Sequence, residues 1–388
     1  MNPLLPTFEA SRAAALQALA RVSPQAYAVS RNHLLGAATA LSPYFTHGLL
    51  TQREVFDFLH QRSPLHPQHK LVYEFGWRAY FRHVWAQLGD GILESLHPGP
   101  LPDAAYHPEL PEDVRQARSG VPAIDQAVRC LYASGHLHNH ARMWLASYLV
   151  HVRKVAWRVG ADWLYGHLLD GDLASNHLSW QWVAGTGSHK PYLFNAENVA
   201  RFAPPEWHSP GSVIDTSYEA LDALAHTPEA IAPSPKGRPG GGLAEPPLRS
   251  TPPDVVPWPD TDLTGRPVWL QHPWALGPRP AEVPQDAVVL GLVLRDCHQR
   301  HPWSGRRWQF VLDGWRTQGT PCWCVDAAGL GRALAGAASV WLQDEPHLRP
   351  WRAALPPHTH WLPEVPLFAE VPGHQASFSR WWQRTRLL

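Results

Sequence analysis

The sequence has few cysteines, no excess of either charge and no long apolar run, and each shortage narrows the range of possible functions. Only four cysteines occur in 388 residues. Cys322 and Cys324 form a close pair, but no second pair completes a tetrahedral metal site. We therefore expect no metal, and we interpret all four thiols, including Cys130 and Cys297, as ordinary buried groups.

The balance of charge excludes another set of functions. Lysine plus arginine equals aspartate plus glutamate at 33 each, so the formal net charge is zero. The net charge therefore does not favour binding to nucleic acid or to an anionic membrane, although a local basic face stays possible.

The sequence also lacks long apolar runs. No stretch approaches the roughly 18 apolar residues of a membrane span, and no basic segment followed by an apolar run begins the chain. These features predict no membrane association and a cytoplasmic location.

Tryptophan is the residue in excess, with 20 copies, and it invites a role in stacking or redox chemistry besides packing. Residues 1–218 are predicted to be mainly helical, because apolar residues recur in them with a helical period. The segment 141–159 is apolar nearly all round, which predicts one central buried helix. Other segments with clear helical periodicity are 11–22, 50–62, 70–88 and 123–135.

The composition changes after residue 218. Residues 219–262 are rich in proline and glycine, which predicts a flexible linker. Residues 263–388 alternate short apolar runs with helical segments, which predicts a small α/β domain with a parallel sheet. The expected strands are 267–271, 287–294, 321–325 and 338–343, and the expected helices are 303–319 and 328–336. The predicted fold class is thus a mainly helical domain plus a smaller α/β domain.

Two stretches of the helical part place polar groups together on helix faces. In "SGHLHNHARMW", Asn139, Arg142 and Met143 share one face, and Arg142 needs an anionic or polar partner because the residues after it are apolar. In "YEFGWRAYFRHVW", Glu74, Trp77 and Arg78 share one turn and could line a cavity for an aromatic ligand with phosphates. A capped surface helix and an amphipathic helix with an ion pair are the alternative interpretations.

A third stretch, "LLDGDLASNHLSWQWVAGTG", brings two carboxylates close to two indoles. Asp170 and Asp172 flank a glycine, so the loop can present one carboxylate to a flavin N–H and the other to an arginine. Asn176 and Trp180 are four residues apart and share a helical face. The alternative is a capped helix with tryptophans in the core.

Taken together and in this order, the motifs between Tyr27 and Phe202 resemble the FAD-binding domain of DNA photolyases and cryptochromes. The resemblance implies FAD as the cofactor, and it leaves the antenna chromophore open. Arg78 would bind the diphosphate, Asp172 would face the N3–C2 edge of the flavin, and Asn176 would face N5. The full set of implied flavin contacts is Tyr27, Thr39, Leu41, Ser42, Arg78, Asn139, Arg142, Asp170, Asp172 and Asn176.

The same resemblance implies blue-light-driven repair of cyclobutane pyrimidine dimers, since Asn139 and Met143 stand where enzymes specific for 6–4 photoproducts carry histidines. The implied catalytic residues are Glu74, Trp77, Asn139, Met143 and Trp182. The implied contacts with UV-damaged DNA are Arg31, Glu74, Trp77, His140 and Trp182. Trp180 and Trp157 would donate electrons to the flavin. The chain lacks the third tryptophan of the family, so either Tyr106 replaces it or the chain of donors stops at Trp157.

Several positions depart from the family pattern. Ala38 replaces a hydroxyl residue, Leu71 a tryptophan and His140 an arginine. The α/β segment follows the FAD motifs instead of preceding them, which suggests a circular permutation with a reduced antenna domain. A cryptochrome-like photoreceptor and a non-photochemical flavin scaffold remain alternatives to a repair enzyme. Repair predicts a basic rim that includes Arg31, Lys190 and Arg201, on a protein expected to be a monomer.

Overall fold

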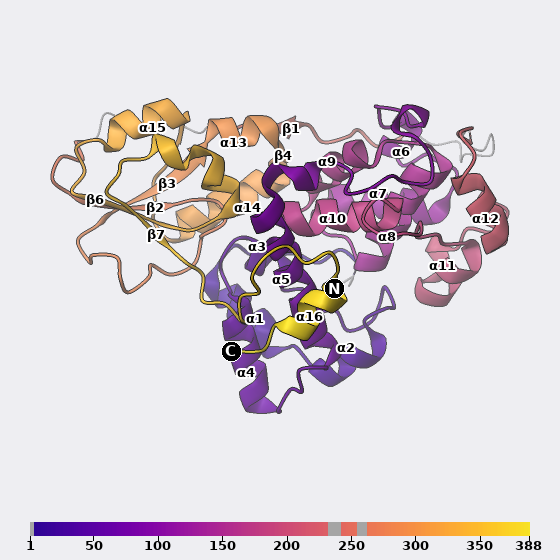
Figure 1. Cartoon of the computed structure of the whole chain (residues 1–388), viewed down its shortest axis with the longest axis horizontal. Coiled ribbons are helices and arrows are strands. Elements are labelled where there is room, and N and C mark those ends of the chain that lie inside the picture. Colours follow the sequence, from indigo (N-terminus) through magenta and orange to yellow (C-terminus); the bar gives the residue numbers. More distant parts are fainter. Residues whose placement is uncertain (1–3, 232–241, 254–261) are drawn as a thin grey trace.

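The protein is described by a computed structural model for residues 4–231, 242–253 and 262–388. Residues 4–231 contain helices joined by loops. Residues 262–388 contain a parallel sheet and further helices. The predicted fold class is therefore confirmed. Figure 1 shows the sheet on one side, helices α6 to α12 on the other, and α1, α2, α4, α5 and α16 beneath their junction.

The ends of the helices follow from local sequence. The side chains of Ser11, Ser23, Thr51 and Asp172 each accept a hydrogen bond from a backbone N–H of the helix they precede, which satisfies a donor that the helix leaves unpaired. The helices are α1 (Arg12–Ala20), α2 (Pro24–Ser30), α3 (Ser42–Thr46), α4 (Gln52–Arg62), α5 (Lys70–Leu88), α6 (Glu112–Arg115), α7 (Pro122–Ser134), α8 (Asn139–Ser147), α9 (Trp157–His167), α10 (Leu173–Ala184), α11 (Ala196–Phe202) and α12 (Tyr218–Ala225).

The prediction of one helix over 141–159 is wrong. Helix α8 runs into a π-helical turn, Tyr148–Val152, and the chain then breaks before α9. The break is at Lys154, whose φ of 51° lies in the left-handed region. Its ammonium group donates to the carbonyls of His151 at 2.7 Å and Leu224 at 2.6 Å. Apolar periodicity gave no sign of this break, since buried residues continue through it.

The sheet has the order β5-β3-β2-β6-β7, and all its strands are parallel. The four predicted strands and two predicted helices are all present with ends shifted by no more than two residues, and β7 is an addition. The strands are β2 (Pro267–Gln271), β3 (Val288–Leu294), β5 (Cys322–Val325), β6 (Ser339–Gln343) and β7 (Thr359–Leu362). The helices are α13 (Arg295–Arg300), α14 (Gly305–Thr317), α15 (Ala327–Leu334) and α16 (Phe378–Arg384).

Part of the predicted linker is ordered structure. Its beginning forms α12, and Glu245 near its middle pairs with Arg115 at 2.9 Å. Strand β1 (Leu248–Arg249) pairs with β4 (Trp303–Ser304) in an antiparallel two-stranded sheet. The prediction of a flexible linker is therefore wrong for these residues, and the rest of it, 232–241 and 254–261, lies outside the described residues.

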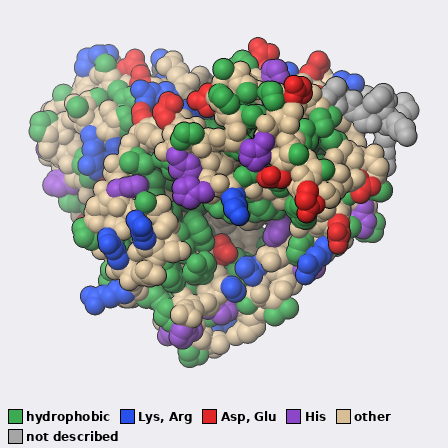
Figure 2. Space-filling view, turned by 45° about the vertical axis from the view of Figure 1, so that its right-hand side comes forward, with side chains coloured by type: hydrophobic (Ala, Val, Ile, Leu, Met, Phe, Trp, Pro, Cys, Tyr) green, Lys and Arg blue, Asp and Glu red, His purple; other side chains and the backbone are tan. Residues whose placement is uncertain are grey.

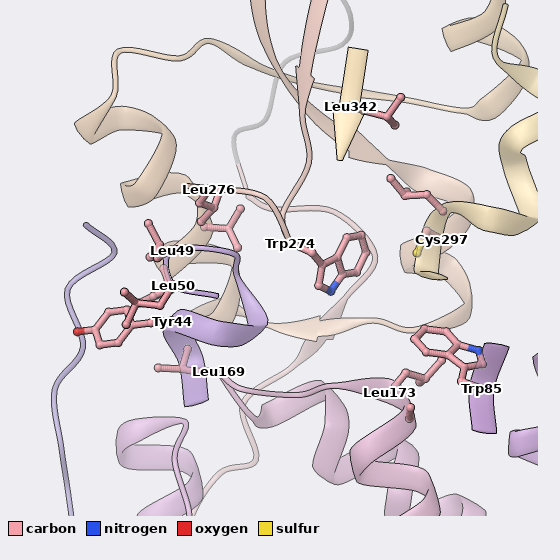
Figure 3. Packing of buried hydrophobic residues seen from close by; sticks show 14 of the residues in the cluster. Tyr44, Leu49, Leu50, Trp85, Leu169, Leu173, Trp274, Leu276, Cys297 and Leu342 are labelled. Carbon is pink, nitrogen blue, oxygen red and sulfur yellow. The ribbon is translucent and has the colours of Figure 1, made fainter. Parts of the chain in front are cut away.

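The helical part and the α/β part share one hydrophobic core. This core contains Tyr44, Leu50 and Leu173 of the helical part together with Trp274 and Leu342 of the α/β part. Figure 3 shows Trp274 projecting between the side chains contributed by both parts. The α/β part is thus packed onto the helices along an apolar interface, and α16 returns from it to pack against α5.

Candidate functional site

The Asp170–Asp172 loop lies where α5, α8 and α10 meet. Asp172 begins α10 by accepting the Ser175 N–H at 2.9 Å, and it is only 2% exposed. Two arginines of α5 reach its carboxylate, Arg78 at 3.3 Å and Arg82 at 3.0 Å. Burial works to raise the pKa of Asp172, but the two guanidinium groups hold it well below its usual range. The site therefore holds a buried carboxylate that stays ionised.

Asp170 is held by the predicted ion pair. Arg142 donates to both carboxylate oxygens, at 2.9 and 2.7 Å, and its Nε donates to the carbonyl of Leu137 at 2.7 Å. Burial works to raise the pKa of Asp170, but Arg142, His136 and a hydrogen bond from Ser42 bring it to about 2. The anionic partner that the sequence required for Arg142 is therefore present.

Glu74 is an exposed residue of α5. Its side chain is 43% exposed, and its Oε1 lies 3.7 Å from the Nε of Arg31. Desolvation by the surrounding protein raises the pKa of Glu74, although Arg31 and Lys70 act to lower it. Tyr27 lies close by, since burial and the charge of Glu74 raise its pKa and the Arg31 guanidinium lies 5.9 Å from its ring centre. Figure 2 shows a hollow near the middle of one face, with basic, acidic and histidine side chains around it.

The other predicted catalytic residues differ in how far their side chains are accessible to a substrate. Asn139 is exposed at the start of α8, where its amide nitrogen lies 3.4 Å from the sulfur of Met143. Trp182 is 40% exposed and leans on Tyr192, with ring centres 5.4 Å apart. Trp77 is different, because the ring of Phe378 from α16 stacks on it at 4.0 Å with an interplanar angle of 12°. A base could stack only on the part of Trp77 that stays accessible.

The predicted electron donors lie along a line of adjacent elements. Trp180 is 2% exposed, and its ring lies over Gly160 of α9, one turn from Trp157. The Trp157 indole donates to Ser95 at 3.0 Å. Tyr106 precedes a β-bridge between His107 and Val155, which brings its backbone beside the start of α9. Trp180 therefore packs against α9, which Trp157 begins, and the backbone next to Tyr106 lies beside the start of that helix.

In the segment 38–41, Ala38 and Ala40, on either side of the predicted flavin contact Thr39, line two separate hollows. One, of about 390 Å³, is lined by Arg21, Ser23, Tyr27 and Thr39, among others. The other, of about 190 Å³, lies on the side of Leu34, His136 and Trp207. Leu41 is fully buried, so its side chain supports the segment from beneath.

The orientation of Asn176 is fixed by α9. Its Nδ2 donates to the carbonyl of Ala161 at 2.8 Å, and the residue is 9% exposed. With the amide nitrogen used in this way, the amide oxygen remains as a hydrogen-bond acceptor.

His140 provides no positive charge near neutral pH. Burial, with Arg31 nearby, lowers its pKa to about 4, and its ring packs 5.1 Å from that of Phe202. Arg201, another residue of the predicted basic rim, has its guanidinium 5.2 Å from the ring centre of Phe202. Lys190 is exposed beyond the end of α10.

Sequence reasoning missed Arg82, Glu345 and Arg307. Arg82 could have been found, because it lies one helical turn after Arg78 and faces the same way. Glu345 and Arg307 come from the α/β part, and no local pattern indicates that Arg307 contacts Gly171 or that Glu345 contacts Arg82. Among residues 4–231, 242–253 and 262–388, no group of three or more histidine, cysteine or acidic side chains could hold a metal ion. No helix in these ranges is long and apolar enough to cross a membrane.

Comparison with known proteins gives one family. The FAD-binding domain of DNA photolyase matches residues 71–209. A chloroplastic/mitochondrial cryptochrome DASH of Oryza sativa is 34% identical over 169 residues, which are 42% of this chain and 29% of that protein. A deoxyribodipyrimidine photo-lyase of Streptomyces griseus is 32% identical over 169 residues, 42% of this chain and 35% of that protein. The chain thus spans about a third of the length of these relatives.

The solved structure of a Synechocystis cryptochrome overlaps 51% of this chain and 44% of its own, with a TM-score of 0.46 and 24% identity. Residues 71–209 of this chain are thus similar to the FAD-binding domain of DNA photolyase, and the relatives that share this region include a cryptochrome and a photolyase. The residues present fit that cofactor. An ionised carboxylate can accept a ring N–H, Asn176 offers an amide oxygen, and Arg78 and Ser42 offer donors for phosphate.

Proposed function

We propose that the protein is an FAD-dependent, blue-light-driven enzyme that repairs cyclobutane pyrimidine dimers in DNA. The observation that carries this proposal is the position of Glu74, an accessible carboxyl 3.7 Å from Arg31, in the same helix as Arg78 and Arg82, which hold Asp172. A binding site for a planar base needs a few polar groups that fix its orientation.

In this proposal, Glu74 binds the carbonyl groups of the flipped dimer. Because the pKa of Glu74 is raised, its carboxyl becomes protonated at a higher pH than that of an ordinary glutamate. The protonated carboxyl can donate a hydrogen bond to a carbonyl oxygen. As negative charge develops on the pyrimidines, that hydrogen bond becomes stronger. Met143 and Trp182 supply apolar contact, and Asn139 supplies an amide at the rim.

When bound, reduced FAD supplies on illumination one electron that passes to the dimer and returns after the two carbon–carbon bonds of the cyclobutane ring have broken. The residues that would hold the cofactor are Asp172, as acceptor for the flavin N3–H, Asn176, whose amide oxygen would serve N5, and Ser42, Thr39 and Arg78, which would bind the phosphates. Tyr27, Leu41, Asn139 and the Arg142–Asp170 pair complete the contacts. Trp180, Trp157 and Tyr106 provide a path for electrons to the flavin.

The proposed partner is UV-damaged DNA, bound by a monomer in the cytoplasm. Arg31 lies 3.7 Å from Glu74, and His140 lies close enough to Arg31 for that charge to lower its pKa. Both residues would contact the DNA backbone. Flipping a damaged base costs a few kcal/mol, about the lowest cost for any paired base, because a dimer stacks poorly.

The order of the two parts along the chain supports a circular permutation. An α/β layer follows the FAD-binding helices and packs on them through a shared core, as an antenna domain placed at the other end of the chain would. Exchanging the two parts, with α/β residues 262–388 ahead of the helical part and a short linker between them, should give a folded, flavin-binding protein. Failure of the exchanged chain to fold would argue against the permutation.

The first experiment measures repair directly. Purified protein is illuminated under reductant with an oligonucleotide that contains one thymine dimer, and the recovery of unmodified thymines is measured. We expect recovery with the unaltered protein and with Glu109→Ala, an exposed control position, and at least tenfold less recovery with Glu74→Ala. Equal recovery with Glu74→Ala would remove this residue from the mechanism.

A cryptochrome-like photoreceptor is the second candidate, and one observation favours it. Phe378 already stacks on Trp77, where a dimer was expected. Bound flavin with no recovery of thymines, in both the unaltered protein and Phe378→Ala, would establish this alternative over repair. Recovery only in Phe378→Ala would show that α16 blocks a competent site.

A further inference from the structure

The α/β part contributes two side chains next to the Asp170–Asp172 loop: Arg307 contacts the loop directly, and Glu345 contacts Arg82, which holds Asp172. Arg307 of α14 is fully buried, and it donates to the carbonyls of Gly171 at 2.6 Å and Tyr165 at 2.9 Å. Its guanidinium lies between the rings of Tyr165 and Trp303, 4.7 and 3.8 Å from their centres. The backbone of the loop is therefore fixed from behind by a side chain of the α/β part.

The contact at Gly171 requires a glycine. A Cβ at this position would lie 2.5 Å from Nη1 of Arg307 and 2.7 Å from the carbonyl oxygen of Tyr165. The glycine between the two aspartates thus makes room for Arg307, as well as allowing a tight loop.

Glu345 acts on the carboxylate end of the same loop through Arg82. It follows β6, is 5% exposed and lies 3.4 Å from the Arg82 guanidinium, which in turn lies 3.0 Å from Asp172. Burial works to raise the pKa of Glu345, but Arg82 and His347 bring it to about 2, so it remains an anion. One arginine is therefore shared between a carboxylate of each part.

Glu345 is itself held in place. Its Oε1 lies 2.7 Å from Nδ1 of His347, and that imidazole stacks on Trp274 at 4.2 Å. Nε2 of His347 lies 3.2 Å from the hydroxyl of Tyr165. The chain from Asp172 through Arg82, Glu345 and His347 to Tyr165 is continuous and mostly buried, so its members cannot easily reorient in water.

We propose that Glu345 and Arg307 are positioning residues of the flavin site, through which the α/β part sets the place and the electrostatic environment of Asp172. This inference rests on FAD binding at Asp172 and not on DNA repair. It makes the α/β part a component of the flavin site. When the charge of Glu345 is removed, Asp172 is the one carboxylate that still pairs with Arg82. The net charge of the site then becomes more positive by one.

The test is Glu345→Gln, which keeps the shape and can still accept from Arg82. An extra positive charge near the flavin stabilises its reduced anion, and we expect the reduced state to gain about tenfold over the oxidised state. For a two-electron couple this is a midpoint potential about 30 mV more positive. Glu345→Asp keeps the negative charge, so its midpoint potential should lie close to that of the unaltered protein. The exposed control Glu282→Gln should leave the potential unchanged.

A second readout does not depend on flavin. Hydrogen exchange in protein without FAD should become faster at the amides of residues 171–176 in Glu345→Gln and in Arg307→Lys, and remain unchanged in Glu282→Gln. If the unaltered protein binds no flavin, the FAD site itself is wrong, whatever the exchange shows. If flavin binds but neither the potential nor the exchange changes in Glu345→Gln, the positioning role is refuted.

Discussion

The substitution Gly160→Ala tests how Trp180, the first residue of the proposed electron path, packs against α9. A Cβ at Gly160 would lie 2.4 Å from two carbons of the Trp180 ring. Carbon atoms in contact are about 3.5 Å apart, so Gly160→Ala must move the indole by roughly 1 Å. Trp180 is 2% exposed, which means that neighbouring core side chains have to move with it.

The size of the effect follows from two opposing terms. Alanine in place of glycine inside a helix stabilises by about 1 kcal/mol, whereas overpacking a close-packed core costs about 1–3 kcal/mol. Gly305→Ala adds a Cβ without overpacking, because nothing lies within 4 Å of that Cβ, and as the first residue of α14 it gains less than the full helix-interior term. We therefore expect Gly160→Ala to be less stable than Gly305→Ala by about 1–2 kcal/mol.

The assay is urea unfolding of both variants, followed by tryptophan fluorescence. In flavin-loaded protein, the displaced Trp180 should also slow light-driven reduction of the flavin, while Gly305→Ala leaves it unchanged. Equal stability of the two variants would refute the packing of Trp180 on α9, and an unchanged rate of photoreduction would remove Trp180 from the electron path.

Two further predictions concern charge. Asp170 and Glu345 have pKa values of about 2 in the folded protein, against about 4 for unfolded carboxyls, so their stabilisation is present above roughly pH 5 and is lost as the pH falls from about 4 to 2. Urea unfolding between pH 7 and pH 2 should show this loss, and Asp170→Asn should show a shallower one. At pH 7, Asp170→Asn should cost about 3 kcal/mol, because it leaves the partly buried Arg142 unpaired; a cost under about 1 kcal/mol would show that the pair contributes little. His140→Arg should strengthen DNA binding and steepen the dependence of log K on log salt by about 0.9, since His140 is neutral at pH 7; an unchanged slope would mean that this position faces away from the DNA.

Short-range signals in the sequence were reliable where one residue decides a local outcome. Asp172 caps α10, and Arg142 pairs with an aspartate, because a helix needs a donor satisfied and a half-buried guanidinium needs an anion. The strands of the sheet were also predictable, since short β-branched runs bounded by turn residues leave few alternatives. Periodicity failed at Lys154, where buried residues continue on both sides of a break that only a left-handed backbone reveals.

The sequence alone therefore indicated the family that the chain resembles and the residues proposed for the FAD site, because those residues lie in motifs in which neighbours along the chain are neighbours in space. Only the tertiary structure decided what surrounds them. Phe378 reaches Trp77, Arg307 reaches Gly171, and Glu345 reaches Arg82, each from more than a hundred residues away. Such contacts depend on how the α/β layer and α16 pack on the helices, and no local pattern of residues encodes that arrangement.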